Sequence, residues 1–278
     1  MGRKERKMEM ESIWMEKSKE IRRLTLESIA HLGVGHIGGS LSIVELLTVL
    51  YYKHMNVDPK NPKMEGRDRL IVSKGHSGPG VYAALASKGY FDVALLYTLN
   101  EFGTLLPSHC DMNKTPGIDM TTGSLGQGFS CSVGIAIASR IKRDNATIYA
   151  IIGDGESQEG QIWEAAMLAS HKKLGNLIAF TDFNKMQIDG NVEDINEAGD
   201  IVGKWTSFGW HTQRIDGHDM DAIDKAIQEA KKATNKPSMI IMDTIKGKGA
   251  KFAEEAGSAC HNMPVTKEMI KEIVEGLK

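Results

Sequence analysis

Two oxygen-bearing side chains at a fixed spacing are the first candidates for chemistry in this sequence. Asp154 directly follows the apolar run TIYAII (147–152) and has glycine on both sides, so a ligand can approach the backbone closely. Asn184 lies 30 residues further on, which is the length of one helix and one strand. A hard cation that also binds phosphates takes one or two protein oxygens. The pair therefore predicts a Mg²⁺ site, with Ca²⁺ or Mn²⁺ as alternatives.

Histidines supply the second set of candidates, because a neutral imidazole can move protons near neutral pH. Four of the nine histidines stand close to Gly, Ser or Pro in predicted loops, where functional residues concentrate. These four are His36, His76, His109 and His261. Three others fit helix faces and are predicted to be structural, namely His31, His54 and His171.

The elements that must position these residues alternate between strand and helix patterns. Short apolar runs predict strands at 69–73, 147–152, 177–182 and 238–245, and the more polar segment HTQRID (211–216) is a further strand candidate. Helical patterns between them predict right-handed crossovers, and hence an α/β fold with a doubly wound, mostly parallel sheet and helices on both faces. Gly-rich or polar segments follow four of these strands. Because ligands bind beyond the carboxyl ends of parallel strands, these four loops are predicted to form one site.

Local signals predict where several helices begin and end. The segment from Ser42 to Glu45 has the pattern of a capping box before the apolar run LLTVLYY. Asp219 is predicted to cap the helix MDAIDKAIQEAKKA, and Gly175 to stop the helix QIWEAAMLASHKKL. Apolar periodicity upstream predicts a first helix that ends near Gly33.

Composition excludes several classes of protein. The 278 residues are 41% apolar and 25% charged, and the net charge of −2 gives no electrostatic case for binding nucleic acid. The sequence has no run of about 18 apolar residues, so no membrane span is predicted. Three widely spaced cysteines argue against a disulfide framework and favour the cytoplasm. The chain is predicted to be a single domain over 1–278, with a short N-terminal tail at about 1–12.

Several motifs in order make the chain resemble the N-terminal region of transketolases, from about Ser18 to Pro264. Asp154 and Asn184 match the thiamine diphosphate signature, in which GDG precedes an Asn at this spacing. The other matching segments are GHIGGSLS (35–42), DRLIVSKGH (68–76), TTGSLGQG (121–128), GDGESQEGQIWEA (153–165), KLGNLIAFTDFNKMQIDG (173–190), KWTSFGWH (204–211), IDGHD (215–219) and TIKGKG (244–249). The resemblance implies thiamine diphosphate and a divalent cation as cofactors.

The resemblance also implies a role for each matching residue. The metal ligands are Asp154, Asn184 and the main-chain carbonyl of Met186. The cofactor contacts are Lys74, His76, Gly123, Ser124, Leu125, Gly155, Glu159, Ile188, Lys246 and His261. Glu159 also matches the acid of the family's subunit contacts. The residues that line the donor ketose, and so are the catalytic candidates, are His36, His109 and His261.

The implied activity is transfer of a two-carbon ketol unit from a ketose phosphate to an aldose or aldose phosphate. Full transketolases continue into a pyrimidine-binding domain, for which this chain has no residues after Pro264. The resemblance therefore implies the N-terminal subunit of a split transketolase, inactive without a separate C-terminal subunit. We expect a homodimer with two partner subunits, in which the small-residue stretch after Thr121 faces another chain.

Three positions depart from the family pattern near the expected donor pocket. Ile37, Cys110 and Asn262 stand where the family usually has Pro, Pro and Gly. Sequence drift and an unusual ketose donor are both open explanations. Other functions also remain open, namely half of a deoxyxylulose phosphate synthase-like or 2-oxo acid dehydrogenase-like enzyme, or a non-catalytic homologue that only binds a partner.

Overall fold

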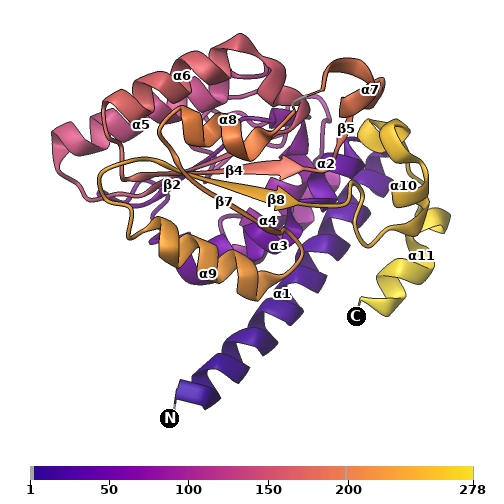
Figure 1. The fold of residues 1–278 in the computed structure, drawn as a ribbon. Coiled ribbons are helices and arrows are strands. Elements are labelled where there is room, and N and C mark those ends of the chain that lie inside the picture. The colour runs from indigo at the N-terminus through magenta and orange to yellow at the C-terminus, as the bar shows by residue number, and fades with distance from the viewer. Residues whose placement is uncertain (1–2, 198, 278) are drawn as a thin grey trace.

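The core of the protein is a five-stranded parallel sheet whose strands match those predicted from the sequence (Figure 1). The computed structural model describes residues 3–197 and 199–277. The strand order is β2-β3-β4-β8-β7. The strands are β2 (Arg69–Val72), β3 (Ile148–Gly153), β4 (Leu177–Phe183), β7 (His211–Asp216) and β8 (Ser238–Asp243). The expected α/β class with a parallel sheet is confirmed.

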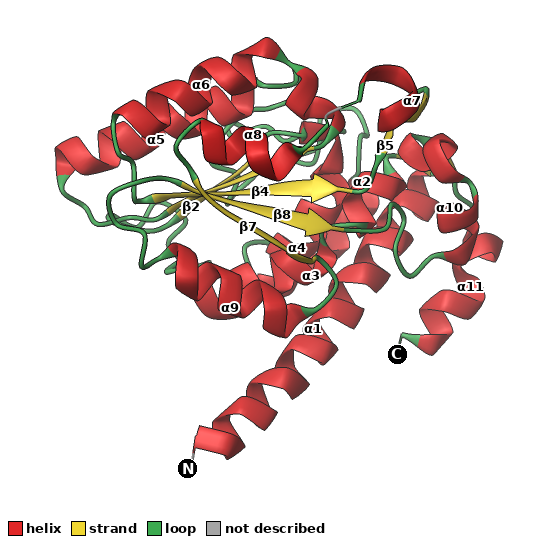
Figure 2. Cartoon of the chain, in the orientation of Figure 1, coloured by secondary structure: helices red, strands yellow, loops and turns green. Residues whose placement is uncertain are grey.

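Helices cover both faces of this sheet (Figures 1 and 2). One face carries α1 (Arg3–Leu32), α3 (Val44–Val49), α4 (Gly78–Lys88) and α9 (Met220–Ala230). The other carries α5 (Gln127–Lys142), α6 (Gly160–His171) and α8 (Ile201–Ser207). Within β3, Tyr149 and Ile151 pack toward the first layer, whereas Ile148 and Ala150 pack toward the second. The alternation follows from the two-residue period of a strand, so both faces of the sheet are buried.

Short elements complete the fold and join distant parts of the chain. The short helices are α2 (Ile37–Leu41), a π-helix (Leu50–His54), α7 (Val192–Asn196), α10 (Lys251–Glu255) and α11 (Lys267–Gly276). The described part of the chain also has 3₁₀ segments at Gly75–Ser77, Val93–Thr98, Gly155–Gln158 and Gly257–His261. The strands β5 (Met186–Gln187) and β6 (Gly190–Asn191) form a hairpin, while β1 (Val34–Gly35) pairs with β9 (Met263–Pro264). The β1–β9 pair holds His36 and His261 near one another.

The first helix is longer than the sequence predicted at its N-terminal end. Its apolar face buries Trp14, Ile21, Leu24 and Ile29, and it ends at Leu32 beside Gly33 as expected. The segment predicted as a tail is helical from Arg3 onward, and its first two residues lie outside the described part of the chain. No helix among the described residues is long and apolar enough to cross a bilayer.

The predicted capping box at Ser42 is wrong. Helix α3 begins at Val44 with no side-chain cap, because the Ser42 hydroxyl donates instead to Asp182 at 2.6 Å. Glu45, the expected partner in the box, is buried and accepts from Arg22 and His218. Contacts with residues distant in sequence therefore take the place of the local capping hydrogen bonds.

The other two helix signals had different outcomes. Asp219 caps α9 as predicted, and its carboxylate accepts from two backbone amides. Gly175 does not stop α6, which ends at His171, and Lys173 takes the left-handed conformation with φ of 52°. Glycine at position 175 instead lets the backbone of Thr234 pack closely, since a Cβ there would lie 2.1 Å from the Thr234 carbonyl oxygen.

Candidate active site

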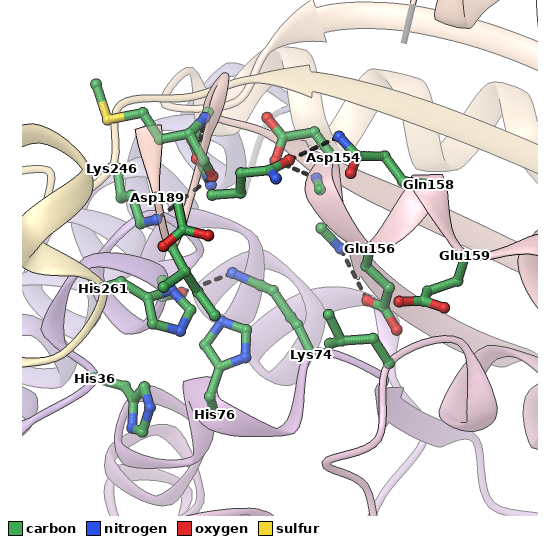
Figure 3. Close-up of a pocket in the computed structure, with 18 of the residues that line it drawn as sticks. His36, Lys74, His76, Asp154, Glu156, Gln158, Glu159, Asp189, Lys246 and His261 are labelled. Carbon is green, nitrogen blue, oxygen red and sulfur yellow. Dashed lines mark hydrogen bonds between the residues drawn. The ribbon is translucent and has the colours of Figure 1, made fainter. Parts of the chain in front are cut away.

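A cavity of about 440 Å³ opens at the carboxyl ends of the strands (Figure 3). Loops that follow β2, β3, β4 and β8 all contribute to it, as the strand pattern predicted. Its lining comprises His36, Gly39, Lys74, His76, His109, Gly123, Leu125, Gly153, Asp154, Gly155, Glu156, Gln158, Glu159, Asn184, Met186, Gln187, Ile188, Asp189, Lys246 and His261. The predicted site residues thus come together from segments more than 200 residues apart.

Ser124 is the one predicted site residue that does not line this cavity. Its side chain is exposed in the turn that precedes α5, and its backbone carbonyl accepts from Gln127. The flanking Gly123 and Leu125 do line the cavity. The roles of these residues stay predictions.

The predicted metal ligands lie together at one end of the cavity. Asp154 is 2% exposed, and its carboxylate accepts from the amides of Gly155, at 2.8 Å, and Lys185. The Asn184 carbonyl oxygen accepts from the Met186 amide at 3.1 Å. Lys185 has a φ of 65°, so the chain reverses directly after Asn184. This reversal and the β5–β6 hairpin bring the Met186 carbonyl to the cavity wall.

These donors suit a hard divalent cation bound to a diphosphate. They comprise one carboxylate, one amide oxygen and one backbone carbonyl, which leaves coordination positions for phosphate oxygens. Burial, followed by the charge of Asp182, raises the pKa of Asp154 to about 7, so a nearby cation would relieve this carboxylate. Nowhere in the described ranges do three His, Cys, Asp or Glu side chains form a metal cluster of their own. The donor set therefore fits Mg²⁺ held jointly with the cofactor.

Asp182 holds two residues that line the cavity, Lys74 and Asn184, and was not predicted. Its fully buried carboxylate accepts from Lys74 at 2.6 Å, from Asn184 at 3.0 Å and from the hydroxyls of Ser42 and Thr244. Burial opposes its ionisation, but Lys74 and these hydrogen bonds hold its pKa below the usual value. Asp182 thereby fixes Lys74, a predicted cofactor residue, whose ammonium also donates to the Gly39 carbonyl at 2.8 Å.

Glu156 joins three of the loops around the cavity and was also missed. Its buried carboxylate accepts from the amides of Gly126 at 2.8 Å and Gly153 at 3.0 Å, and from the Ser73 hydroxyl. Gly126 begins the turn into α5, so Glu156 fixes that turn relative to β2 and β3. The signal in the sequence was a second acid two residues after Asp154, within a segment too polar for the core.

Three of the predicted histidines, His36, His76 and His261, lie on the side of the cavity opposite Glu156 and Glu159 (Figure 3), and His109 also lines the cavity. Ring centroids lie 5.5 Å apart for His36–His76, 5.4 Å for His36–His109 and 4.7 Å for His76–His261. Burial, followed by neighbouring positive charge or imidazole, lowers the pKa of His36 and of His261 to about 4. All four histidines have lowered pKa values and are neutral at physiological pH, so they can both donate and accept hydrogen bonds.

The three positions that depart from the family pattern do not line the cavity. Ile37 and Cys110 are buried in the hydrophobic core, and Asn262 is exposed. Each adjoins one of the predicted catalytic histidines in sequence. Any influence on a donor sugar would therefore act through the backbone that carries those histidines, and not through direct side-chain contact.

A parallel α/β sheet with a cavity suited to a diphosphate and a cation defines a class of cofactor-binding proteins, and comparison with known proteins narrows it. The family model described as "Transketolase, thiamine diphosphate binding domain" matches residues 15–277. The chain belongs to the transketolase family. Within that family it is the thiamine diphosphate-binding N-terminal subunit of a transketolase, which is a transferase.

Two relatives are themselves separate subunits of about the same length. The 6-deoxy-6-sulfo-D-fructose transketolase subunit SqwG of Clostridium sp. (strain MSTE9) is 60% identical over 258 residues, which is 93% of this chain and 94% of that protein. An apulose-4-phosphate transketolase subunit of Phocaeicola vulgatus is 36% identical, over 98% of this chain and 97% of that protein.

Solved transketolases share the fold but are longer. A variant transketolase from Pichia stipitis in complex with fructose-6-phosphate superposes with a TM-score of 0.88 at 34% identity, over 95% of this chain and 40% of that one. Transketolase from Campylobacter jejuni superposes with a TM-score of 0.87 at 33% identity, over 96% of this chain and 43% of that one. This chain therefore spans about 40% of the length of these solved relatives.

Proposed function

We propose that this chain and a C-terminal subunit with a pyrimidine-binding domain form a transketolase whose donor is 6-deoxy-6-sulfo-D-fructose. One observation carries the choice of donor, which is the 60% identity over 93% of the chain to the SqwG subunit, whereas the apulose-4-phosphate relative is 36% identical. The family match favours this reaction over the deoxyxylulose phosphate synthase-like and 2-oxo acid dehydrogenase-like alternatives.

The reaction moves carbons 1 and 2 of the donor to an aldose. Cleavage between carbons 2 and 3 of a six-carbon sulfosugar leaves a four-carbon aldose that carries the sulfonate. When bound, thiamine diphosphate supplies the carbon nucleophile and holds the electron pair of the transferred fragment. Asp154, Asn184 and the Met186 carbonyl would hold Mg²⁺ against the diphosphate. A second candidate donor is an ordinary ketose phosphate of the pentose phosphate pathway.

Neutral histidines suit the proton transfers that this cleavage requires. Breaking the bond between carbons 2 and 3 removes a proton from a sugar hydroxyl, and His36, His109 and His261 can accept or return one. Their depressed pKa values keep the imidazoles in the basic form at neutral pH. The confined cavity would limit access of water to the reacting carbons.

The anionic end of the donor is proposed to bind the C-terminal partner. Within the cavity lining, the lysines are Lys74 and Lys246, and both are buried close to Asp182 or Asp154. Lys74 is paired with Asp182, and Lys246 is a predicted contact of the cofactor, so neither lysine is assigned to a sulfonate or a sugar phosphate. A four-chain assembly with two copies of each of the two chains is proposed on the family pattern.

The free cysteines at 110, 131 and 260 support a cytoplasmic location.

Co-expression with the C-terminal partner and a panel of donors tests this function. We expect turnover of 6-deoxy-6-sulfo-D-fructose with an aldose phosphate acceptor, dependent on thiamine diphosphate and Mg²⁺, and little turnover by either chain on its own. Mass spectrometry of the four-carbon sulfonated product measures the reaction directly. A kcat/KM higher for fructose 6-phosphate than for the sulfosugar would contradict the proposed donor and favour the ketose phosphate alternative.

A further inference from the structure

His218 lies outside the cavity but contacts the backbone of a loop that lines it. It belongs to the IDGHD segment (215–219), which matches the family pattern yet has no part in the proposed chemistry. The amide of Ile245 donates to His218 Nε2 at 2.8 Å. The next residue along the chain is Lys246, whose side chain reaches the cavity.

The hydrogen bonds of His218 fix its tautomer. A backbone amide can only donate, so Nε2 must be the unprotonated nitrogen that accepts. Nδ1 then carries the proton and donates to the Glu45 carboxylate at 3.0 Å. Burial opposes ionisation of Glu45, but this hydrogen bond and Arg22 hold its pKa below the usual value. The buried pair of Arg22 and Glu45 therefore orients the imidazole toward Ile245.

Three contacts secure the loop that carries Lys246. Ile245 is held by His218, and the Gly247 amide donates to the Gly38 carbonyl at 3.0 Å. Gly249 packs closely on Arg22, since a Cβ at that glycine would lie 2.7 Å from the Arg22 side chain. Arg22 thus supports the loop both directly and through Glu45 and His218.

The position of Lys246 makes this support relevant to the cofactor. Its side chain is 5% exposed, and Nζ lies 3.4 Å from the carbonyl oxygen of Met186, a predicted metal ligand. Burial of an ammonium carries a free-energy cost, so its position depends on a backbone that does not move. A shift of the Ile245 amide would carry Lys246 away from the end of the cavity where the predicted metal ligands lie and where the diphosphate is expected.

We infer that His218 is a positioning residue that holds the backbone of Ile245 so that the Lys246 ammonium faces the cofactor diphosphate. The inference rests on the proposed role of Lys246 in cofactor binding. His218 acts only as a hydrogen-bond acceptor for this loop, and it touches neither the cofactor nor the sugar.

Two substitutions separate the two hydrogen bonds of His218. In His218→Asn the amide nitrogen can replace Nδ1 and keep the bond to Glu45, but the acceptor for Ile245 is lost. In His218→Gln the carbonyl oxygen can replace Nε2 and keep that acceptor. We expect His218→Asn to weaken binding of thiamine diphosphate with Mg²⁺ by about fivefold, the value of one hydrogen bond. The affinity of His218→Gln for thiamine diphosphate with Mg²⁺ should stay within about twofold of that of the parent, because the acceptor for Ile245 is kept.

Hydrogen exchange followed by mass spectrometry measures the loop without any cofactor. The peptide containing Ile245 should exchange faster in His218→Asn than in the parent or in His218→Gln. Ile245→Pro removes the same amide hydrogen and leaves His218 intact, so it should reproduce the weaker cofactor binding if His218→Asn does not fold. Equal exchange in His218→Asn and the parent would overturn the inference.

A double-mutant cycle tests whether the effect passes through Lys246. In a Lys246→Met background, His218→Asn should cause no further loss of cofactor affinity, whereas an undiminished loss would overturn the inference. The proposed function fails separately if the parent chain, together with its C-terminal partner, binds no thiamine diphosphate. The exchange comparison would still decide whether His218 holds the loop.

Discussion

Asp154 combines deep burial with a neighbouring carboxylate, an arrangement that a bound cation would relieve. Its removal should therefore abolish metal-dependent cofactor binding. We expect Asp154→Ala to reduce the affinity for thiamine diphosphate with Mg²⁺ by more than about 100-fold, since even outer-shell partners of a metal contribute about 10- to 100-fold. Calorimetry on the complete complex measures it.

Asp189→Asn is the matched control for this change. Asp189 lines the same cavity and loses the same charge in the variant, but its side chain is exposed and it is not a predicted ligand. It should bind the cofactor within a few-fold of the parent. Unchanged affinity in Asp154→Ala would refute the metal-ligand assignment.

Metal binding should release a proton from Asp154 near neutral pH. The carboxylate must be ionised to bind a cation, and its pKa of about 7 leaves it half protonated at pH 7. Affinity should therefore fall as the pH drops, by about fivefold from pH 7 to pH 6. His36 and His261 do not contribute over this range, because burial lowers their pKa values to about 4.

Calorimetric titrations of Mg²⁺ in two buffers with different ionisation enthalpies count the released proton. About half a proton should be released at pH 7 and almost none at pH 8, following the same pKa of Asp154. A pH-independent affinity between pH 6 and pH 8 would show that another group holds the metal.

Sequence alone could predict the residues that face the cavity better than those beneath it. Asp154, Asn184 and Lys246 stand in Gly-rich or polar segments after strands, where function is expected. Asp182 could not be predicted in the same way, because it is part of the apolar strand LIAFTD and its partners come from three distant segments. Only the tertiary structure explains an acid at a fully buried strand position.

At the scale of elements, four of the five strands of the main sheet were predictable because their burial on both faces gives continuous apolar runs, whereas the edge strand β7 is partly exposed and has no such run. The ends of helices were less predictable from the sequence than the strands. Ser42 had the local pattern of an N-cap, but it lies close enough to Asp182 for a charge-assisted hydrogen bond, which is stronger than a neutral one. Gly175 had the pattern of a helix stop, but the close approach of Thr234 determined that position.

The segment around Cys110 gives a prediction about loop stability. The Cys110 amide donates to the Gly75 carbonyl at 3.4 Å, and proline has no amide hydrogen. We expect Cys110→Pro to lower the free energy of unfolding by about 1 kcal/mol more than Cys110→Ala, which keeps the amide. Ile37→Pro should be tolerated, because Ile37 is the first residue of α2. Denaturant titration of the variants measures both, and equal losses for Pro and Ala at position 110 would contradict the prediction.

The same three positions test whether donor choice depends on the loops that carry the histidines. Ile37→Pro, Cys110→Pro and Asn262→Gly together should raise turnover of ordinary ketose phosphates relative to the sulfosugar, without changing cofactor affinity. The expected effect acts by moving His36, His109 and His261, since none of the three positions lines the cavity. Competition between two donors in one reaction measures it. If the parent and the triple variant have the same preference, the departures are sequence drift.

At the scale of the whole molecule, α5 and α6 present a surface that suits another chain. Phe129, Val133 and Ala136 of α5 pack on the sheet, whereas Gly134 and Ile141 are exposed. Met167 and Leu168 of the neighbouring α6 are 54% and 44% exposed. A small-residue helix beside exposed apolar side chains allows close approach of a second helix.

We therefore expect a homodimer of this chain that recruits two C-terminal partners. Light scattering should give about twice the mass of one chain when this protein is measured by itself, and a four-chain mass with the partner. Gly134→Arg should reduce the dimer to monomers, while Lys232→Glu, an exposed change on the opposite side of the sheet, should not. A stable monomer with transketolase activity on its own would refute the split-enzyme proposal.

The order of the strands has a consequence for how the chain folds during synthesis. Among the described residues, strand β7 pairs only with β8, which is made later and enters the sheet between β4 and β7. The emerging chain therefore carries an unpaired edge strand until Asp243 leaves the ribosome, and such edges are prone to aggregation. The pairing of Gly35 with Met263 comes later still, so the histidine cluster is among the last parts of the molecule to assemble.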